Sequence, residues 1–322
     1  MKSQNQQITR SQLGKILNFP LFYIVIFALL LFMLLPSFSF GQGYVEGVNI
    51  SYDHMPMKIE TPNGDQKFTG NNLKIATSIP LFLTPNKSKY LIVGGNLEAF
   101  NFSGTHPDFE VKRVYSISPT LGYSTMVSKN FNLTALLMPT MNSDYKTVKG
   151  SDIKLAAIVR GSWKVSENLT WKAILGYRRQ FYGPQYIVLV GMDWKVNDKW
   201  QIYGDIPHSL TASYAVNEKV NTGFNLFVQN STYRLENQDR YFEYNSVNPG
   251  FFAERYISSK WAVRATAAYT LIRNMEVYHK TDKADFVDFY ELGNRKDPIN
   301  PEVAAGMSFK IGLSYRIVPG KK

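Results

Sequence analysis

The chain contains no cysteine among its 322 residues. Disulfide scaffolds, thiolate metal sites and lipid attachment to an N-terminal cysteine are therefore excluded. Charged residues are sparse, at 19%, and unbalanced: 36 Lys and Arg against 25 Asp and Glu give a formal net charge of +11. A basic excess of this size indicates an anionic partner, either a nucleic acid or an anionic lipid surface.

Only one long apolar run occurs, and it lies near the N-terminus. A polar segment with three basic side chains precedes it, and residues 21–35 are then apolar without interruption. This order is typical of an export signal, so residues 1–42 are predicted to be a signal peptide cleaved after Gly41 or Gln42. An uncleaved membrane anchor is the alternative. Removing the three charges from +11 leaves +8 on residues 43–322.

Residues 43–322 lack any apolar run near the ~20 residues of a transmembrane helix. Instead, a short turn recurs five times: a β-branched residue, three polar residues and an apolar residue. The copies begin at Val127, Val165, Val196, Val216 and Ile257. Tight turns of this kind join antiparallel strands and place one end of each hairpin on the same side. Their unequal spacing argues against a solenoid.

Between these turns, apolar and polar residues alternate, as in residues 153–165, 169–177 and 303–317. A soluble sandwich alternates too, but its strands usually have ~5–6 residues, whereas transmembrane strands need ~9–11. These segments have roughly 11 to 16. We therefore predict an all-β fold, a transmembrane antiparallel up-and-down β-barrel of 12 to 14 strands over residues 43–322. The lower number allows for a short pair near 200–216, which contains Pro207.

The tryptophans give an independent indication of a membrane protein. Every one lies within two positions of a repeated turn, whereas a soluble core would not confine them to one end. We expect them to form an interface girdle at the turn end: Trp163, Trp171, Trp194, Trp200 and Trp261. Tyrosines near the opposite strand ends are expected to form a second girdle: Tyr177, Tyr182, Tyr186, Tyr233, Tyr241 and Tyr278.

On this strand assignment, most basic residues fall on the face that points into the barrel. The candidate lumenal bases are Lys154, Arg160, Lys164, Lys172, Arg178, Arg264, Lys310 and Arg316. A lumen lined by cations favours anions. We expect a narrow anion-preferring channel or a barrel that binds a small anionic solute. The alternative is a plugged structural or binding barrel, in which these bases pair with carboxylates and apolar side chains fill the space. Surface bases interleaved with aromatics are missing, so nucleic acid is not an expected partner.

Little in the sequence indicates catalysis, and we expect no enzyme and no cofactor. The only neighbouring acid and histidine, Asp53 and His54, point to opposite faces of a strand. An outer-membrane hydrolase with a site assembled from several strands is the less favoured alternative. No metal motif is present. Acidic residues recur every third position at Asp282, Asp285, Asp288 and Glu291. A short helix with a solvated acidic edge explains them better than a Ca²⁺ site.

The last strand resembles the terminal signal that outer-membrane barrels present to their assembly machinery, through Lys310, Gly312, Tyr315 and Ile317. It departs from that signal because five more residues follow it. Residues 200–234, with Trp200-Gln-Ile-Tyr-Gly-Asp-Ile-Pro207 and Ser231-Thr-Tyr-Arg234, resemble a family of uncharacterised outer-membrane β-barrel proteins of Bacteroidota, a domain of unknown function. The resemblance implies the outer membrane of a Gram-negative bacterium, with membrane lipids and the assembly machinery as partners, and no catalytic residues.

Overall fold

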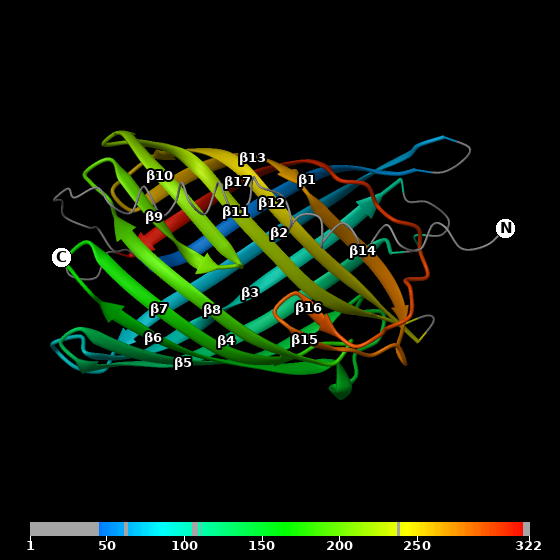
Figure 1. The fold of residues 1–322 in the computed structure, drawn as a ribbon, viewed down its shortest axis with the longest axis horizontal. Helices are drawn as coiled ribbons and strands as arrows, with labels where there is room; N and C mark the ends of the chain where they lie inside the picture. Colours follow the sequence, from blue (N-terminus) through cyan, green and yellow to red (C-terminus); the bar gives the residue numbers. More distant parts are fainter. Residues whose placement is uncertain (1–44, 61–63, 105–108, 110, 237–238, 318–322) are drawn as a thin grey trace. The chain divides into compact units, whose positions relative to one another are not determined.

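The computed structural model describes residues 45–60, 64–104, 109, 111–236 and 239–317. They form a closed antiparallel β-barrel, which confirms the predicted fold class (Figure 1). The predicted signal peptide lies outside these residues. Within the described part of the chain, no helix is long and apolar enough to cross a membrane.

Fourteen strands close the barrel, at the upper end of the predicted range. The strands are β1 (Val45–Ile59), β2 (Gln66–Phe82), β3 (Lys89–Ser103), β4 (Arg113–Ser128), β5 (Phe131–Ser143), β6 (Ile153–Lys164), β7 (Leu169–Arg179), β8 (Pro184–Lys195), β9 (Trp200–Ile206), β10 (Ser209–Asn217), β11 (Val220–Leu235), β12 (Arg240–Tyr256), β13 (Trp261–Thr270), β14 (Ile272–His279), β15 (Asp285–Val287), β16 (Tyr290–Leu292) and β17 (Gly306–Ile317), with a 3-10 turn, η1, at Gly150–Asp152. Strands β13 and β14 both pair with β12 and count as one crossing. Strands β15 and β16 form a hairpin within the loop from β14 to β17.

The first and last strands close the barrel. Strand β17 pairs with β1 from Val45 opposite Ile317 to His54 opposite Phe309, and on its other side with β13. Every strand in the wall therefore has a neighbour on both sides over part of its length, which satisfies the backbone groups that a bilayer could not hydrogen-bond.

The recurring sequence motif is a turn stabilised by its second residue. In all five copies the side-chain oxygen of this residue accepts a hydrogen bond from the backbone N–H two positions later. The accepting residues are Ser128, Ser166, Asn197, Asn217 and Ser258. Short polar side chains favour this local bond, so the motif predicts these hairpin ends correctly.

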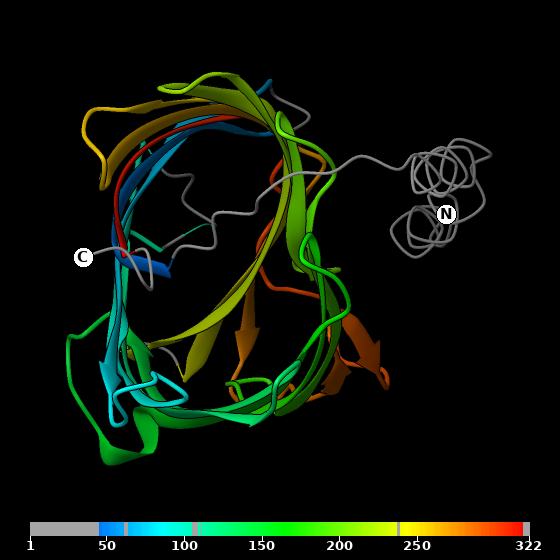
Figure 2. The same ribbon diagram turned by 90° about the vertical axis from the view of Figure 1, so that its left-hand side faces the viewer.

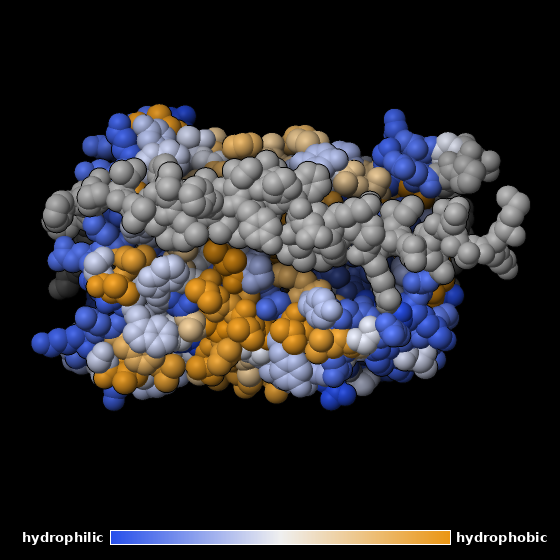
Figure 3. Space-filling model, viewed as in Figure 1, coloured by the Kyte–Doolittle hydropathy of each residue, from blue (hydrophilic) through white to orange (hydrophobic). Residues whose placement is uncertain are grey.

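Alternation along the strands places apolar side chains outside. Leu121, Val190 and Ile311 are 56%, 57% and 56% exposed, although each lies within a long strand. On the face shown in Figure 3, apolar residues occupy the middle of the barrel and hydrophilic residues gather at both ends. An apolar band between two polar rims is the outer surface that a lipid bilayer requires.

The outer half of the barrel, away from the repeated turns, does not have an open lumen. The parts of β11 and β12 that lie away from the repeated turns leave the wall together with β14. They cross the interior, as the yellow-green to orange strands show in the end-on view of Figure 2. The backbone of Arg234, near the end of β11, forms a parallel β-bridge with Ser143 of β5, which lies in a different part of the wall. We call residues 228–235, 240–247 and 272–279 the inner sheet.

The inner sheet separates from the wall where β13 gives way to β14. Strand β13 pairs with β17 as far as Thr270 opposite Gly306, and β14 continues without β17. Arg273 is 3% exposed, and its guanidinium donates to the carbonyl oxygens of Pro56, Gly306 and Met307 at 3.1–3.2 Å. These bonds satisfy carbonyls that the separation would otherwise leave buried and unpaired.

One face of the inner sheet packs against the wall formed by β1–β4. Tyr233, Phe242 and Met275 of the sheet and Phe100 and Phe102 of the wall belong to one buried apolar cluster. Phe102 and Phe242 meet edge to face at 5.8 Å. This cluster fills the space between the inner sheet and β1–β4 with side chains, so that part of the barrel is a core rather than a pore.

The wall has a notch above the short hairpin of β9 and β10. Strand β9 pairs with β8 only from Val190 to Lys195, so the outer part of β8 lacks β9 as a neighbour. The β15–β16 hairpin occupies this place through a short parallel pairing with β8 at Gln185 and Tyr186. It exposes Tyr290 and Leu292 on its outer side and buries Phe286 on its inner side, so it continues the two-sided pattern of the wall.

We expect Phe242→Ala to loosen the inner sheet without preventing barrel formation. Loss of a buried phenylalanine costs about 3–5 kcal/mol because it leaves a cavity. Hydrogen exchange in residues 228–247 should accelerate, while heat-modifiable gel migration still reports a folded barrel. Phe251→Ala is the matched control, since Phe251 is 72% exposed on the outside. Equal exchange in both variants would contradict an apolar contact as the anchor of the inner sheet.

Candidate lumenal site

The lumen at the turn end is polar, and its side chains form ion pairs. Glu254 accepts hydrogen bonds from Arg264 at 2.9 Å and from Arg316 at 2.6 Å. Lys310 lies 3.2 Å from Asp53 in a second pair. Lys310 is 35% exposed in its side chain, so this half of the lumen is accessible to water, whereas Arg316 is 3% exposed.

Five of the predicted bases form a row along the inner face of two adjacent strands. We call this row the cation ladder, and it consists of Lys154, Arg160, Lys164, Lys172 and Arg178. Register places Arg160 opposite Ile174 and Lys172 opposite Ser162, and the outward neighbours on these strands are apolar. Lys172 lies 3.8 Å from Asp205, while Arg160 forms no ion pair among the described residues.

All eight predicted bases thus lie on strands in the positions that alternate with the apolar outer face. The sequence did not reveal their partners. Asp53, Asp205 and Glu254 supply the ion pairs. Glu254 faces Arg264 across the β12–β13 hairpin, whereas Asp53 meets Lys310 and Glu254 meets Arg316 only because β17 closes the barrel.

At the outer end, the ladder meets the polar face of the inner sheet. Arg178 donates to Asn230 at 2.6 Å, and Thr232 donates to Gln180 at 2.7 Å. Arg234, at the end of β11, forms a 2.7 Å ion pair with Asp152, which is 1% exposed. Side chains therefore make most of the contacts between this edge of the inner sheet and the wall of β5–β8, unlike the continuous backbone pairing elsewhere.

Further cations gather at the outer mouth beside Lys154. Lys154 lies over the ring of Phe181 at 4.6 Å, and Lys283 donates to the carbonyl oxygen of the same residue. Burial, together with Lys154 and Lys280 nearby, lowers the pKa of Lys283. The outer end of the ladder therefore lies in a region of positive potential.

The tryptophans all lie at the turn end, on β6, β7, β8, β9 and β13. Trp163 is directly opposite Trp171, and Trp261 packs against Tyr315 at 5.1 Å. Their role as a membrane girdle stays a prediction. The tyrosine girdle is wrong for four of its six residues, because only Tyr177 and Tyr186 are exposed. The other four are buried inside: Tyr182, Tyr233, Tyr241 and Tyr278.

The segment with the recurring acidic residues does not form the predicted short helix. Residues 285–292 form the β15–β16 hairpin, and the side chain of Asp288 accepts a 3.3 Å hydrogen bond from the N–H of Val188. Asp282 is 8% exposed, so the acidic positions do not share a solvated edge. Among the described residues, no group of His, Cys, Asp and Glu is arranged to hold a metal ion.

The described histidines lie apart. His54 bonds Asn71 at 2.9 Å, His279 is exposed, and His208 lies 3.7 Å from Asp288 at the tip of the short hairpin. The residues of the predicted assembly signal all lie in β17, the strand that closes the barrel. Their recognition by an assembly machinery stays a prediction.

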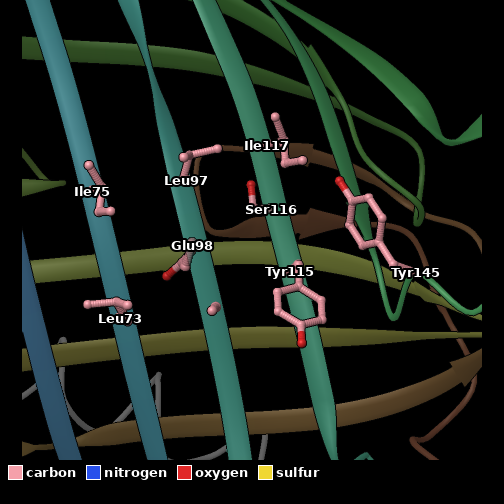
Figure 4. Close-up of a pocket in the computed structure, with 9 residues that line it drawn as sticks. Leu73, Ile75, Leu97, Glu98, Tyr115, Ser116, Ile117 and Tyr145 are labelled. Atoms are coloured by element: carbon pink, nitrogen blue, oxygen red, sulfur yellow. The ribbon is translucent and has the colours of Figure 1, made fainter.

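An apolar hollow lies on the wall of β2–β4 and faces outward. It encloses about 390 Å³ around the small side chain of Ala99, and Leu73, Leu97 and Ile117 surround it (Figure 4). These side chains belong to the lipid-facing surface. The hollow is therefore separate from the lumenal site.

A family model matches residues 51–316, under the description "Domain of unknown function (DUF6268)". The chain belongs to this family. Membership in DUF6268 confirms the resemblance to a barrel family of unknown function, while an origin in Bacteroidota stays a prediction. Among curated proteins, no sequence matches the chain.

The solved structures similar to this DUF6268 member include an outer-membrane channel, COG4313, from Pseudomonas putida F1. It is 10% identical, with a TM-score of 0.44, over 86% of this chain and 97% of that one. The toluene transporter TodX of P. putida is 7% identical, with a TM-score of 0.43, over 86% and 91%. The translocator domain of the autotransporter NalP from Neisseria meningitidis is 11% identical, with a TM-score of 0.34, over 84% and 88%.

We expect Arg234→Gln to free the end of β11 in this DUF6268 barrel. Removing one partner of a buried ion pair costs about 3–5 kcal/mol, because Asp152 stays buried without its cation. The N–H of Asp144, which donates to the carbonyl of Arg234, should exchange faster. Lys58→Gln is the control, because it breaks exposed pairs with Glu60 and Asp65. Unchanged exchange at Asp144 would show that the ion pair does not hold the inner sheet.

Proposed function

We propose that the protein is an outer-membrane barrel of a Gram-negative bacterium that passes a small solute, and that it is closed at its outer end in this structure. The barrel fold and its apolar outer band support placement in the outer membrane. An origin in Bacteroidota belongs to the same proposal, through the resemblance of residues 200–234.

One observation carries the proposal: the β11 edge of the inner sheet is held differently from its two faces. One face packs in a dry core against β1–β4, and on the other face Tyr241 and Tyr278 pack in a second buried cluster, whereas side-chain hydrogen bonds and the Arg234–Asp152 pair connect the β11 edge to the wall of β5–β8. Water can replace polar contacts at little net cost, but it cannot replace a buried apolar core. The side facing β5–β8 is therefore where a passage opens.

A passage on that side runs along the cation ladder and favours anions. Lys154 and Arg178 lie at its outer end, and Arg160 and Lys172 lie further toward the turns. The bases near Glu254 and Asp53 contribute less, because their charges are neutralised in ion pairs. The proposed solute is a small anion that enters a water-accessible vestibule at the turn end.

A plugged barrel that conducts nothing is the second candidate. The apolar cluster of the inner sheet favours it, since Phe100 and Phe242 are fully buried inside the barrel. The two candidates differ in whether release of the polar edge opens a path.

Planar-bilayer recordings under a salt gradient test the proposal. The wild type should show rare steps, and Arg234→Gln should show frequent ones. In that background, Arg160→Gln with Arg178→Gln should lower the anion preference. A unit charge ~8 Å from the path in water contributes about 0.5 kcal/mol, or about twofold in permeability, so two charges give about fivefold.

The control removes the same charge from exposed turns, through Lys129→Gln with Lys219→Gln, and should leave selectivity nearly unchanged. All variants must show heat-modifiable migration as folded barrels. Silence from a folded Arg234→Gln barrel would overturn the channel and favour the plugged barrel. Steps without any change in reversal potential would overturn the cation ladder as the path.

A further inference from the structure

The guanidinium of Arg295 occupies a closed cage at the outer end of the barrel. It lies 3.9 Å from the ring centre of Tyr278, 5.4 Å from Phe286 and 5.8 Å from Tyr182. Glu243 and Glu291 lie 2.6 Å and 3.2 Å from its nitrogens. Aromatic faces combined with carboxylates form the kind of site that binds an organic cation.

The occupant of the cage belongs to a surface loop. The Arg295 side chain is 4% exposed, whereas its neighbours Asn294 and Lys296 are exposed. The side chain of Arg295 therefore extends from the surface loop into the cage. Gly293, two positions earlier, has a φ of +124°, which L side chains rarely adopt, so glycine permits this change of chain direction.

Most of the cage remains when Arg295 is removed. Tyr241, Glu243, Tyr278 and Tyr182 belong to the inner sheet and to the β7–β8 connection, not to the loop that carries Arg295. Tyr241 and Tyr278 stack at 5.6 Å with an interplanar angle of 22°, and Tyr182 donates to Gln185 at 2.7 Å. The walls are therefore fixed by contacts that do not involve Arg295.

A third carboxyl group lies beside the cage. Glu276, on β14, accepts a 2.9 Å hydrogen bond from Tyr278, and the described residues provide no ion pair to it. Glu276 lies opposite Glu243 in the β12–β14 register, so two carboxylates contact the guanidinium of Arg295 and a third carboxyl group lies next to them. These oxygen acceptors suit a guanidinium, whereas the cation ladder is lined by donors.

We propose that this cage is a binding site for a small guanidinium compound, and that Arg295 is an internal occupant that such a ligand displaces. Planar guanidinium fits the site better than a primary ammonium, because it donates to two carboxylates and stacks on Tyr278 at once. Displacement frees the loop that also carries the β15–β16 hairpin. The site adjoins the outer end of the proposed anion path, since Tyr182 of the cage and Arg178 both donate to Asn230.

Calorimetry with arginine amide on the folded full-length barrel tests the proposal. Arg295→Ala removes the competitor, so the ligand should bind at least about tenfold more tightly than to wild type. Lysine amide should bind more weakly than arginine amide. Adding Glu243→Gln to Arg295→Ala should abolish binding. Lys296→Ala is the matched control and should behave as wild type, because it removes an exposed charge from the same loop.

A second measurement uses the wild-type chain, in case Arg295→Ala leaves too little folded barrel. Arginine amide should accelerate backbone hydrogen exchange in residues 293–297, because displacement of Arg295 loosens this segment. The proposal would be overturned if arginine amide left the exchange of residues 293–297 unchanged in wild type. It would also be overturned if arginine amide bound Arg295→Ala and Lys296→Ala with equal affinity. Neither readout depends on conductance, so a silent bilayer recording leaves this test independent.

Discussion

Satisfaction of backbone hydrogen bonds in an apolar surrounding is the constraint on which the structure depends. A strand that leaves the wall of a membrane barrel abandons a row of carbonyl and amide groups, and the bilayer offers them no partners. Here β14 leaves β17, and the side chain of Arg273 replaces the missing strand as donor. Asn248 acts similarly on β12, since its amide donates to the carbonyl of Phe227 at 3.3 Å. The inner sheet can exist because side chains satisfy the backbone at the point of separation.

Two kinds of contact hold the inner sheet in place across the lumen. On one side Phe102 and Phe242 belong to a core that resembles the interior of a soluble protein. On the other side Arg178 and Arg234 hold the sheet through polar bonds, next to a row of cations. The proposed opening along β5–β8 depends on this difference, because water can replace the polar contacts of the β11 edge but not the apolar core. The β15–β16 hairpin and Arg295 lie over this same side, so they belong to the exchangeable part.

Much of the barrel could be predicted from the sequence because its rules are local. Ser166 and Asn197 stabilise their own turns, and the period of two decides which side of a strand meets lipid. The inner sheet was not predicted: residues 241–244 of β12 are buried on both faces and lose the alternation of the wall strands, but their aromatic side chains also suit the end of a membrane strand. Tyr233 and Tyr241 therefore read as girdle residues but are buried. The partners of the lumenal bases were missed for a related reason: Glu254 meets Arg316 only after the last strand closes the barrel.

The short hairpin of β9 and β10 makes one side of the wall respond to the thickness of the membrane. Strand β9 has 7 residues. That length rises only about 18 Å across a bilayer at a tilt of ~40°, against an apolar band of ~25 Å. Lipids beside this hairpin must thin, or the β15–β16 hairpin must supply the missing height with Val287, Tyr290 and Leu292. A thicker membrane therefore favours the β15–β16 hairpin in its position beside β8, whereas a thinner membrane favours this position less. Membrane composition thereby acts on the same loop that carries Arg295.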